Sequence, residues 1–173
     1  QVHGCFIDFS KAFDSVRWPA LRQALSTWRV PPDLLNAVLQ VMDGHRVRVR
    51  SDGFLSDAIA LHLGVLQGDT LAPFLFIVVL DAVLRGLPDV GLPVSPPPPR
   101  LTRRQSALYT TAPQLQISHS AYADDICLLA ASLPDLLTLF RALEKRAAAA
   151  GLRINFGKGK TDRKDRLVFR RIL

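Results

Sequence analysis

Two adjacent aspartates, Asp124 and Asp125, lie within an otherwise apolar run from Ala121 to Leu129. Two like charges side by side in such a segment repel each other and resist burial. Binding of a divalent cation by both carboxylates makes this arrangement tolerable. The pair therefore indicates metal-dependent catalysis. A solvated surface turn is the plainer alternative, because aspartate is common in turns.

A third carboxylate strengthens the metal interpretation. Asp8 ends a strand-like run, Cys5 to Phe9, and it too has apolar neighbours in the sequence. If the two strand ends are neighbours in one sheet, the three carboxylates converge. Such a cluster can hold two Mg²⁺ ions about 3.5–4 Å apart, which is the geometry that stabilises the attacking and leaving oxygens in phosphoryl transfer. Ligands that are all oxygen favour Mg²⁺ or Mn²⁺ over zinc.

A loop over residues 64–70 carries the next polar group of interest. Gly64 and Gly68 allow its backbone to approach a ligand closely, and Pro73 suits the first turn of a following helix. Gln67 then lies at the entrance of that helix. There it either contacts a ligand or belongs to an ordinary helix-capping loop.

The remaining elements must position these residues. Alternation with period two predicts strands over 2–9, 115–122, 126–129 and 153–156, and a hairpin that runs from 46–50 through a turn at 51–53 to 59–63. Helical spacing predicts helices over 18–28, 33–42, 71–87 and 133–150, the last capped by Gly151. This order predicts an α+β fold, in which helices pack on one face of a mostly antiparallel sheet and leave the other face for a ligand.

Composition and charge narrow the class of protein. The chain has 173 residues, of which 49% are hydrophobic, so a single domain with a real core is expected and a disordered chain is excluded. Residues 141–173 hold 11 Lys and Arg against 3 Asp and Glu, whereas residues 1–140 hold 11 against 12. The basic excess is therefore local to the C-terminal fifth, where it forms either a solvated tail or a phosphate-facing patch.

Cysteine usage and hydropathy bear on the compartment. Cys5 and Cys127 lie in separate apolar runs, which favours reduced, buried thiols inside a cell, in the nucleus or cytoplasm. The most apolar stretch, residues 74–84, is interrupted by Asp81 and is too short to span a bilayer, so no membrane association is expected. No starting Met or targeting segment is visible, and we expect the chain to be an excerpt from a longer protein.

Four segments, in order, resemble the motifs of reverse transcriptases of the non-LTR retrotransposon type. They are residues 6–16 for motif A, 64–76 for motif B, Tyr122-Ala123-Asp124-Asp125 for motif C and 151–158 for motif D. The resemblance implies a polymerase palm over residues 1–160 that contains a proline-rich insertion at 88–105. A basic segment at 161–173 would begin the region downstream.

The resemblance also implies the catalytic residues. Asp8 and Asp124 would be the main ligands of Mg²⁺ or Mn²⁺, with Asp125 beside them and less directly involved. Lys158 would protonate the departing pyrophosphate. The motif D pattern is blurred, however, because a Lys-Thr pair typical of the family comes only at Lys160, so either lysine could hold the role.

Five further residues would contact the substrates. Phe13 would lie under the incoming sugar and disfavour a 2′-hydroxyl, although plain core packing also explains it. Phe9 would supply a backbone contact near the triphosphate. Gln67 and Gly68 would contact the incoming nucleotide and the template, and Tyr122 would support the primer end.

The implied activity is RNA-directed DNA polymerisation, with an RNA template, a DNA primer and dNTPs as partners. Nothing that resembles the fingers precedes motif A, and no thumb follows, so the excerpt alone is expected to be weakly active or inert. Two alternatives stay open. One is the palm of an RNA-dependent RNA polymerase. The other is a degenerate or domesticated remnant that binds nucleic acid without catalysis.

Overall fold

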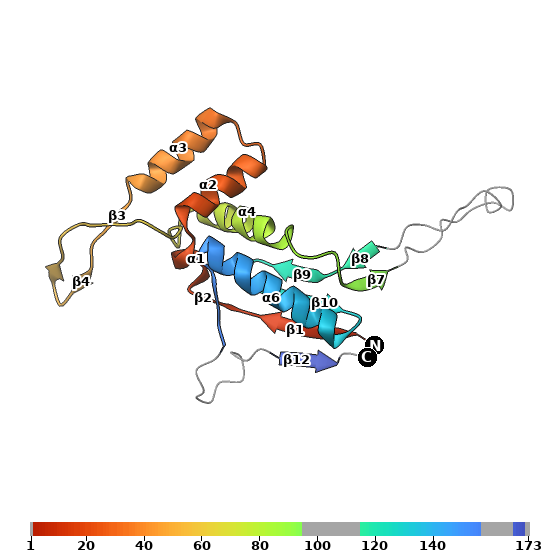
Figure 1. Cartoon of the computed structure of the whole chain (residues 1–173). Coiled ribbons are helices and arrows are strands. Elements are labelled where there is room, and N and C mark those ends of the chain that lie inside the picture. Colours follow the sequence, from red (N-terminus) through yellow and green to blue (C-terminus); the bar gives the residue numbers. More distant parts are fainter. Residues whose placement is uncertain (1, 95–114, 157–167, 172–173) are drawn as a thin grey trace, which may run out of the picture. The chain divides into compact units, whose positions relative to one another are not determined.

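The computed structural model describes residues 2–94, 115–156 and 168–171 (Figure 1). The chain forms two compact units. The first unit comprises residues 1–8, 87–142 and 155–173, and the second unit comprises residues 9–86 and 143–154. None of the helices in the described ranges is both long and apolar enough to cross a membrane.

A four-stranded antiparallel sheet forms the first unit. Its strand order is β12 (Val168–Arg171), β1 (His3–Ile7), β10 (Asp125–Ala130), β9 (His119–Tyr122). All three strand pairs are antiparallel. The expected α+β class with antiparallel strands is therefore confirmed.

One face of this sheet is buried. Along β10, Ile126, Leu128 and Ala130 are buried while the residues between them are not, as expected where alternate side chains point to opposite faces. The register sets Cys5 and Ile7 of β1 opposite Leu128 and Ile126, so that these buried residues share a face. On the other face, Phe6 is 51% exposed.

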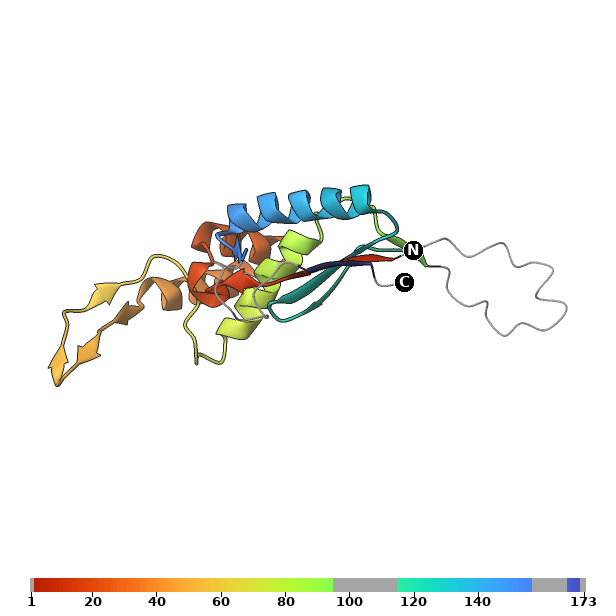
Figure 2. The ribbon, with the colours of Figure 1, turned by 90° about the horizontal axis from the view of Figure 1, so that it is seen from below.

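Helix α6 (Leu133–Ala150) reproduces the predicted bounds 133–150. Its first ten residues belong to the first unit, and they lie over the sheet in both ribbon views (Figures 1 and 2). Leu136 and Leu139 are fully buried there. At the start of the helix, the Asp135 backbone N–H donates to the Ser132 hydroxyl at 3.3 Å, a local N-terminal cap.

The two cysteines differ in burial. Cys5 is fully buried, and burial raises the pKa of its thiol to about 11, with a smaller contribution from Cys127. Cys127 is only half-buried, so the expectation that both thiols are buried is wrong for this residue. The reason is its place in the strand: it lies opposite Phe6 on the more exposed face. Both cysteines are free.

The predicted strand 115–122 is two strands in the structure. β8 (Leu115–Ile117) pairs with β7 (Leu92–Val94), whereas β9 pairs with β10, so the chain changes partner at Ser118. The proline-rich insertion at 88–105 lies largely outside the described residues.

Four helices belong to the second unit. They are α1 (Ala12–Ser15), α2 (Trp18–Thr27), α3 (Pro32–Asp43) and α4 (Ala72–Leu84). The last three each have proline at the first or second position, where its missing N–H costs no helical hydrogen bond. The helices predicted over 18–28 and 33–42 are thus confirmed.

Helix α4 ends earlier than the predicted residue 87. The Arg146 side chain of α6 donates through Nε to the Val83 carbonyl at 2.8 Å and through Nη2 to the Ala82 carbonyl at 2.9 Å. These carbonyls are among the last of the helix and have no intrahelical partner. A cap that comes from a distant part of the chain therefore marks the helix end.

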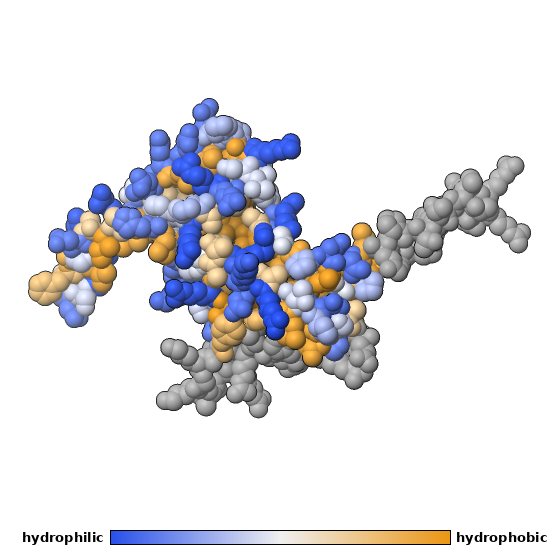
Figure 3. All heavy atoms as spheres, viewed as in Figure 1, coloured by the Kyte–Doolittle hydropathy of each residue, from blue (hydrophilic) through white to orange (hydrophobic). Residues whose placement is uncertain are grey.

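A long hairpin leaves α3 as predicted. β3 (Arg46–Val47) pairs with β6 (Ile59–Ala60), and β4 (Arg50–Ser51) pairs with β5 (Phe54–Leu55). The turn residues Asp52 and Gly53 both have positive φ, +46° and +85°, as a type I′ turn requires. The hairpin carries exposed apolar residues (Figure 3), including Phe54, which is 81% exposed.

Candidate active site

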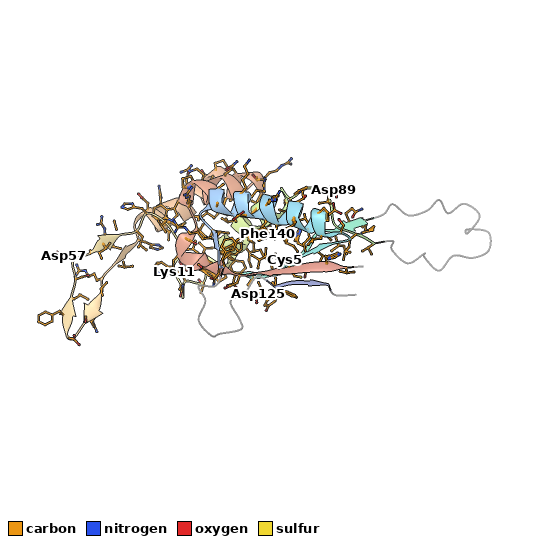
Figure 4. The ribbon with its side chains drawn as sticks, turned by 60° about the horizontal axis from the view of Figure 1, so that its bottom comes forward. Cys5, Lys11, Asp57, Asp89, Asp125 and Phe140 are labelled. Atoms are coloured by element: carbon orange, nitrogen blue, oxygen red, sulfur yellow. The ribbon has the colours of Figure 1, made fainter. Side chains whose placement is uncertain are left out.

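The first unit brings Asp8 and Asp125 together. β1 ends one residue before Asp8. β10 begins at Asp125, which is labelled in Figure 4. The register pairs Ile7 with Ile126, the last pair of this ladder, and one further position along it would set Asp8 opposite Asp125. Residues opposite each other on antiparallel strands have Cα atoms about 4.5–5.5 Å apart and share a face. Two carboxylates that are distant in the sequence thus come from adjacent ends of two paired strands.

Asp124 lies in the turn beside this pair, as predicted. Tyr122 and Asp125 are the last paired residues of the β9–β10 hairpin, which leaves Ala123 and Asp124 as a two-residue loop. Ala123 has a φ of +52°, a left-handed conformation that costs a residue with a Cβ roughly 1–2 kcal/mol. The tight turn leaves Asp124 half-buried and Asp125 exposed.

These carboxylates suit a hard divalent cation. Within the described ranges, no group of three or more His, Cys, Asp or Glu side chains could hold a metal ion. Two neighbouring carboxylates are nevertheless enough for Mg²⁺, which is usually held by one or two carboxylates together with substrate phosphates and keeps several waters. The donor set contains only carboxylate oxygens, which suit Mg²⁺ or Mn²⁺ better than zinc.

Asn155 is a partner of Asp8 that sequence reasoning missed. Its backbone N–H donates to the Asp8 carbonyl at 2.9 Å, and its Nδ2 donates to Asp8 Oδ2 at 3.2 Å. Asn155 directly follows β11 (Arg153–Ile154), and Asp8 directly precedes β2 (Phe9–Ser10), the strand with which β11 pairs. The one signal in the sequence was the position of Asn155 inside the segment that resembles motif D.

In the second unit, the glycine loop is held against α1. The Gly64 N–H donates to the Val16 carbonyl at 2.7 Å, and the Val65 N–H donates to the Phe13 carbonyl at 2.8 Å. Trp18 Nε1 donates to the Gly64 carbonyl at 2.9 Å. A Cβ on Gly64, whose φ is +85°, would lie 2.8 Å from the Asp14 carbonyl oxygen. Only glycine allows this close approach.

Gln67 and Gly68 follow in the same loop, and both are exposed. Gln67 Nε2 donates to Asp14 Oδ1 at 3.3 Å, a long hydrogen bond that holds the amide toward α1. Beside the loop lies a cleft of about 440 Å³, lined by residues that include Val47, His62 and Gln67. The amide of Gln67 is therefore available to a ligand at this cleft.

Phe13 packs against the core with one side of its ring. Its ring stacks on the ring of Phe76, with centroids 4.8 Å apart and planes at 20°. Phe76 is fully buried in α4, whereas Phe13 is half-buried. Packing thus fixes one side of the Phe13 ring while part of its surface stays accessible.

The other predicted site residues have contrasting environments. Phe9 is buried, with only 4% of the residue's surface exposed. Tyr122, in contrast, is 85% exposed beside the aspartate turn. Lys158 and Lys160 lie outside the described residues.

Comparison with known proteins identifies the family. A family model described as reverse transcriptase (RNA-dependent DNA polymerase) matches residues 1–165. The chain is also 30% identical over 162 residues to the Pol polyprotein of the R2DM retrotransposable element of Drosophila melanogaster, covering 91% of this chain and 14% of that protein. The R2 polyprotein of Bradysia coprophila is 29% identical over 161 residues, 93% of this chain and 16% of its own length. The chain belongs to the reverse transcriptase family, of the non-LTR retrotransposon type.

Two further facts qualify these similarities. The chain spans less than a fifth of the length of the curated relatives that it matches. Among solved structures, apo telomerase of Candida tropicalis, truncated of its C-terminal domain, has a TM-score of 0.60 at 13% identity. That match covers 97% of this chain and 32% of the telomerase chain. At this identity the likeness concerns the fold.

Proposed function

We propose that this chain is the palm of an RNA-directed DNA polymerase that transfers nucleotides from dNTPs to a primer. The 3′-hydroxyl of the primer attacks the α-phosphate of the dNTP in line, a P–O bond to the primer forms, and pyrophosphate leaves. One observation carries the proposal: β1 pairs with β10, so Asp8, which follows β1, and Asp125, which begins β10, come from adjacent strand ends, with Asp124 in the adjoining turn.

Asp8, Asp124 and Asp125 would hold Mg²⁺ or Mn²⁺. When bound, the metal supplies positive charge against the oxygens that become more negative during the transfer. The protein residues would fix the position of that charge, because Asp8 directly follows a central strand and Asp124 is confined to a two-residue loop. Lys158 or Lys160 would protonate the departing pyrophosphate.

The substrate contacts follow from the residues of the second unit and of the aspartate turn. The Phe9 backbone would contact the triphosphate, and Phe13 would exclude a 2′-hydroxyl. Gln67 and Gly68 would face the incoming nucleotide and its template base, which suits their exposed positions. The exposed ring of Tyr122 would support the primer end.

An RNA template and a DNA primer are the proposed partners, and base pairing rather than side-chain contact would select each dNTP. The proposed palm domain covers residues 1–160, with helices on one face of its sheet, and the basic residues of 161–173 would face phosphates. The fragment alone is proposed to have little activity, because a palm needs other parts of the polymerase to clamp its substrates.

Primer extension tests the proposal. The full-length gene product should extend a DNA primer on an RNA template with dNTPs and Mg²⁺, whereas residues 1–173 alone should extend it weakly or not at all. Preferential use of rNTPs would select the RNA polymerase alternative. RNA binding that is metal-independent and salt-sensitive, without any extension, would select the remnant that only binds nucleic acid.

Phe13→Val is expected to admit ribonucleotides. Removal of the ring should raise the efficiency of rNTP relative to dNTP incorporation by about 10- to 200-fold, since steric discrimination by one side chain is of that size. Single-nucleotide incorporation kinetics measure the ratio. Phe76→Leu is the matched control, because it removes the stacking partner but keeps the Phe13 ring. An equal change of selectivity in the control would assign the effect to packing.

A further inference from the structure

We propose that Asn155 is a positioning residue, which orients the Asp8 carboxylate so that its second oxygen is presented to the bound cation. The inference rests on the proposed function and deepens it, because it assigns a task to a residue that does not itself touch the substrate. Asn155 comes from the segment after α6, whereas Asp8 comes from the end of β1. Two segments that are distant in the sequence thus contribute to one proposed metal site.

Two hydrogen bonds fix the relation between the two residues. The backbone bond, Asn155 N–H to the Asp8 carbonyl at 2.9 Å, continues the β2–β11 pairing by one residue. The side-chain bond, Nδ2 to Asp8 Oδ2 at 3.2 Å, depends on the amide and would be lost on truncation. A substitution at Asn155 therefore removes the carboxylate contact while the backbone contact remains available.

The side-chain bond engages one carboxylate oxygen. An ionised carboxylate accepts hydrogen bonds at both oxygens, and a bond to a fixed donor restricts rotation of the group. With Oδ2 held by the amide, Oδ1 is the oxygen left for a cation. Hydrogen-bonded partners of metal-binding carboxylates typically contribute 10- to 100-fold to metal affinity or activity.

The chemical type of the residue matters as much as its position. An amide offers a donor and carries no charge, so it can hold Asp8 without competing for the cation. A carboxylate at the same position would set a second negative group within about 3 Å of the Asp8 carboxylate, and like charges so close repel. Asn155→Asp and Asn155→Ala therefore have different expected effects, although both remove the donor.

The experiment compares variants of the full-length gene product in three measurements. Mn²⁺ binding is followed by electron paramagnetic resonance, which needs no turnover. The Mg²⁺ concentration for half-maximal primer extension and the midpoint of thermal unfolding are the other two. Arg153→Lys is the matched control, since this exposed residue lies on β11, two residues before Asn155, and the substitution keeps its charge.

Asn155→Ala is expected to weaken Mn²⁺ binding and to raise the half-maximal Mg²⁺ concentration, each by about 10- to 100-fold. The unfolding midpoint should stay close to that of Arg153→Lys. Asn155→Asp should reduce extension further even at saturating Mg²⁺. Unchanged metal dependence in both variants, whether or not the unfolding midpoint falls, would overturn the inference and leave Asn155 with a structural role only.

Asp8→Asn separates this inference from the proposed function. If Asp8→Asn abolishes extension and weakens Mn²⁺ binding while Asn155→Ala changes neither, the inference fails and the proposed function stands. If Asp8→Asn itself leaves both unchanged, the proposed function fails, and the inference fails with it. Loss of metal affinity in both variants supports both the inference and the proposed function.

Discussion

Asp124→Asn in the full-length gene product is expected to lower the rate of primer extension by on the order of 10³-fold. The substitution keeps the size of the side chain and removes its charge, and the loss of one well-placed electrostatic contact costs about 10²- to 10³-fold or more in catalysis. Asp124 is half-buried in a two-residue loop, so its carboxylate has a restricted position. Single-turnover extension at saturating dNTP measures the chemical step.

Asp52→Asn is the matched control for this prediction. Asp52 also lies in a two-residue hairpin loop, and asparagine is favoured in a type I′ turn, so the same chemical change should leave extension and stability nearly unaltered. Asp125→Asn should have a smaller effect than Asp124→Asn, because Asp125 is proposed to be the less direct ligand. Wild-type extension by Asp124→Asn would refute the assigned role.

Gly151→Ala is expected to destabilise the second unit by about 2–5 kcal/mol. Gly151 has a φ of +95°, which costs a residue with a Cβ roughly 1–2 kcal/mol. An added Cβ would also overlap the Ser15 carbonyl oxygen, and forced overpacking costs typically 1–3 kcal/mol more. The surrounding backbone is fixed, because the Arg17 N–H donates to the Ala150 carbonyl at 2.9 Å.

Equilibrium denaturation of the variant measures this loss, and Gly53→Ala provides the control. Gly53 has a φ of +85°, but a Cβ there would meet nothing within 4 Å. Gly53→Ala should therefore be destabilised only by the cost of a positive φ. The difference between the two variants in the free energy of unfolding then isolates the close approach to Ser15. Equal destabilisation by both substitutions would show that the overlap is relieved without cost.

Local chemistry made several elements predictable. The Asp52-Gly53 turn was expected because this dipeptide adopts positive φ at both positions, and the hairpin follows. Helix α6 has its expected bounds because its apolar spacing is regular and a glycine ends it. The turn at Asp124 was likewise evident, because a charged pair interrupts two apolar runs.

Other features depend on partners that are distant in the sequence. The change of strand partner at Ser118 could not be read from an alternating pattern that continues through it. The early end of α4 comes from Arg146, and the contact of Asn155 with Asp8 comes from strand pairing. Periodicity carries no information on such contacts. The stack of Phe13 on Phe76 joins two segments in the same way.

The pairing of β1 with β10 has a consequence for synthesis of the chain. Roughly 120 residues separate Cys5 from its partner Leu128, so the ribosome must add that length of chain after β1 before β1 can pair with β10. At a translation rate of about 5–20 residues per second, the apolar strand β1 stays without its partner β10 for roughly 6–24 s. Unpaired strand edges of this kind associate readily with other chains. Production of this protein should therefore depend on chaperones that shield β1 during translation.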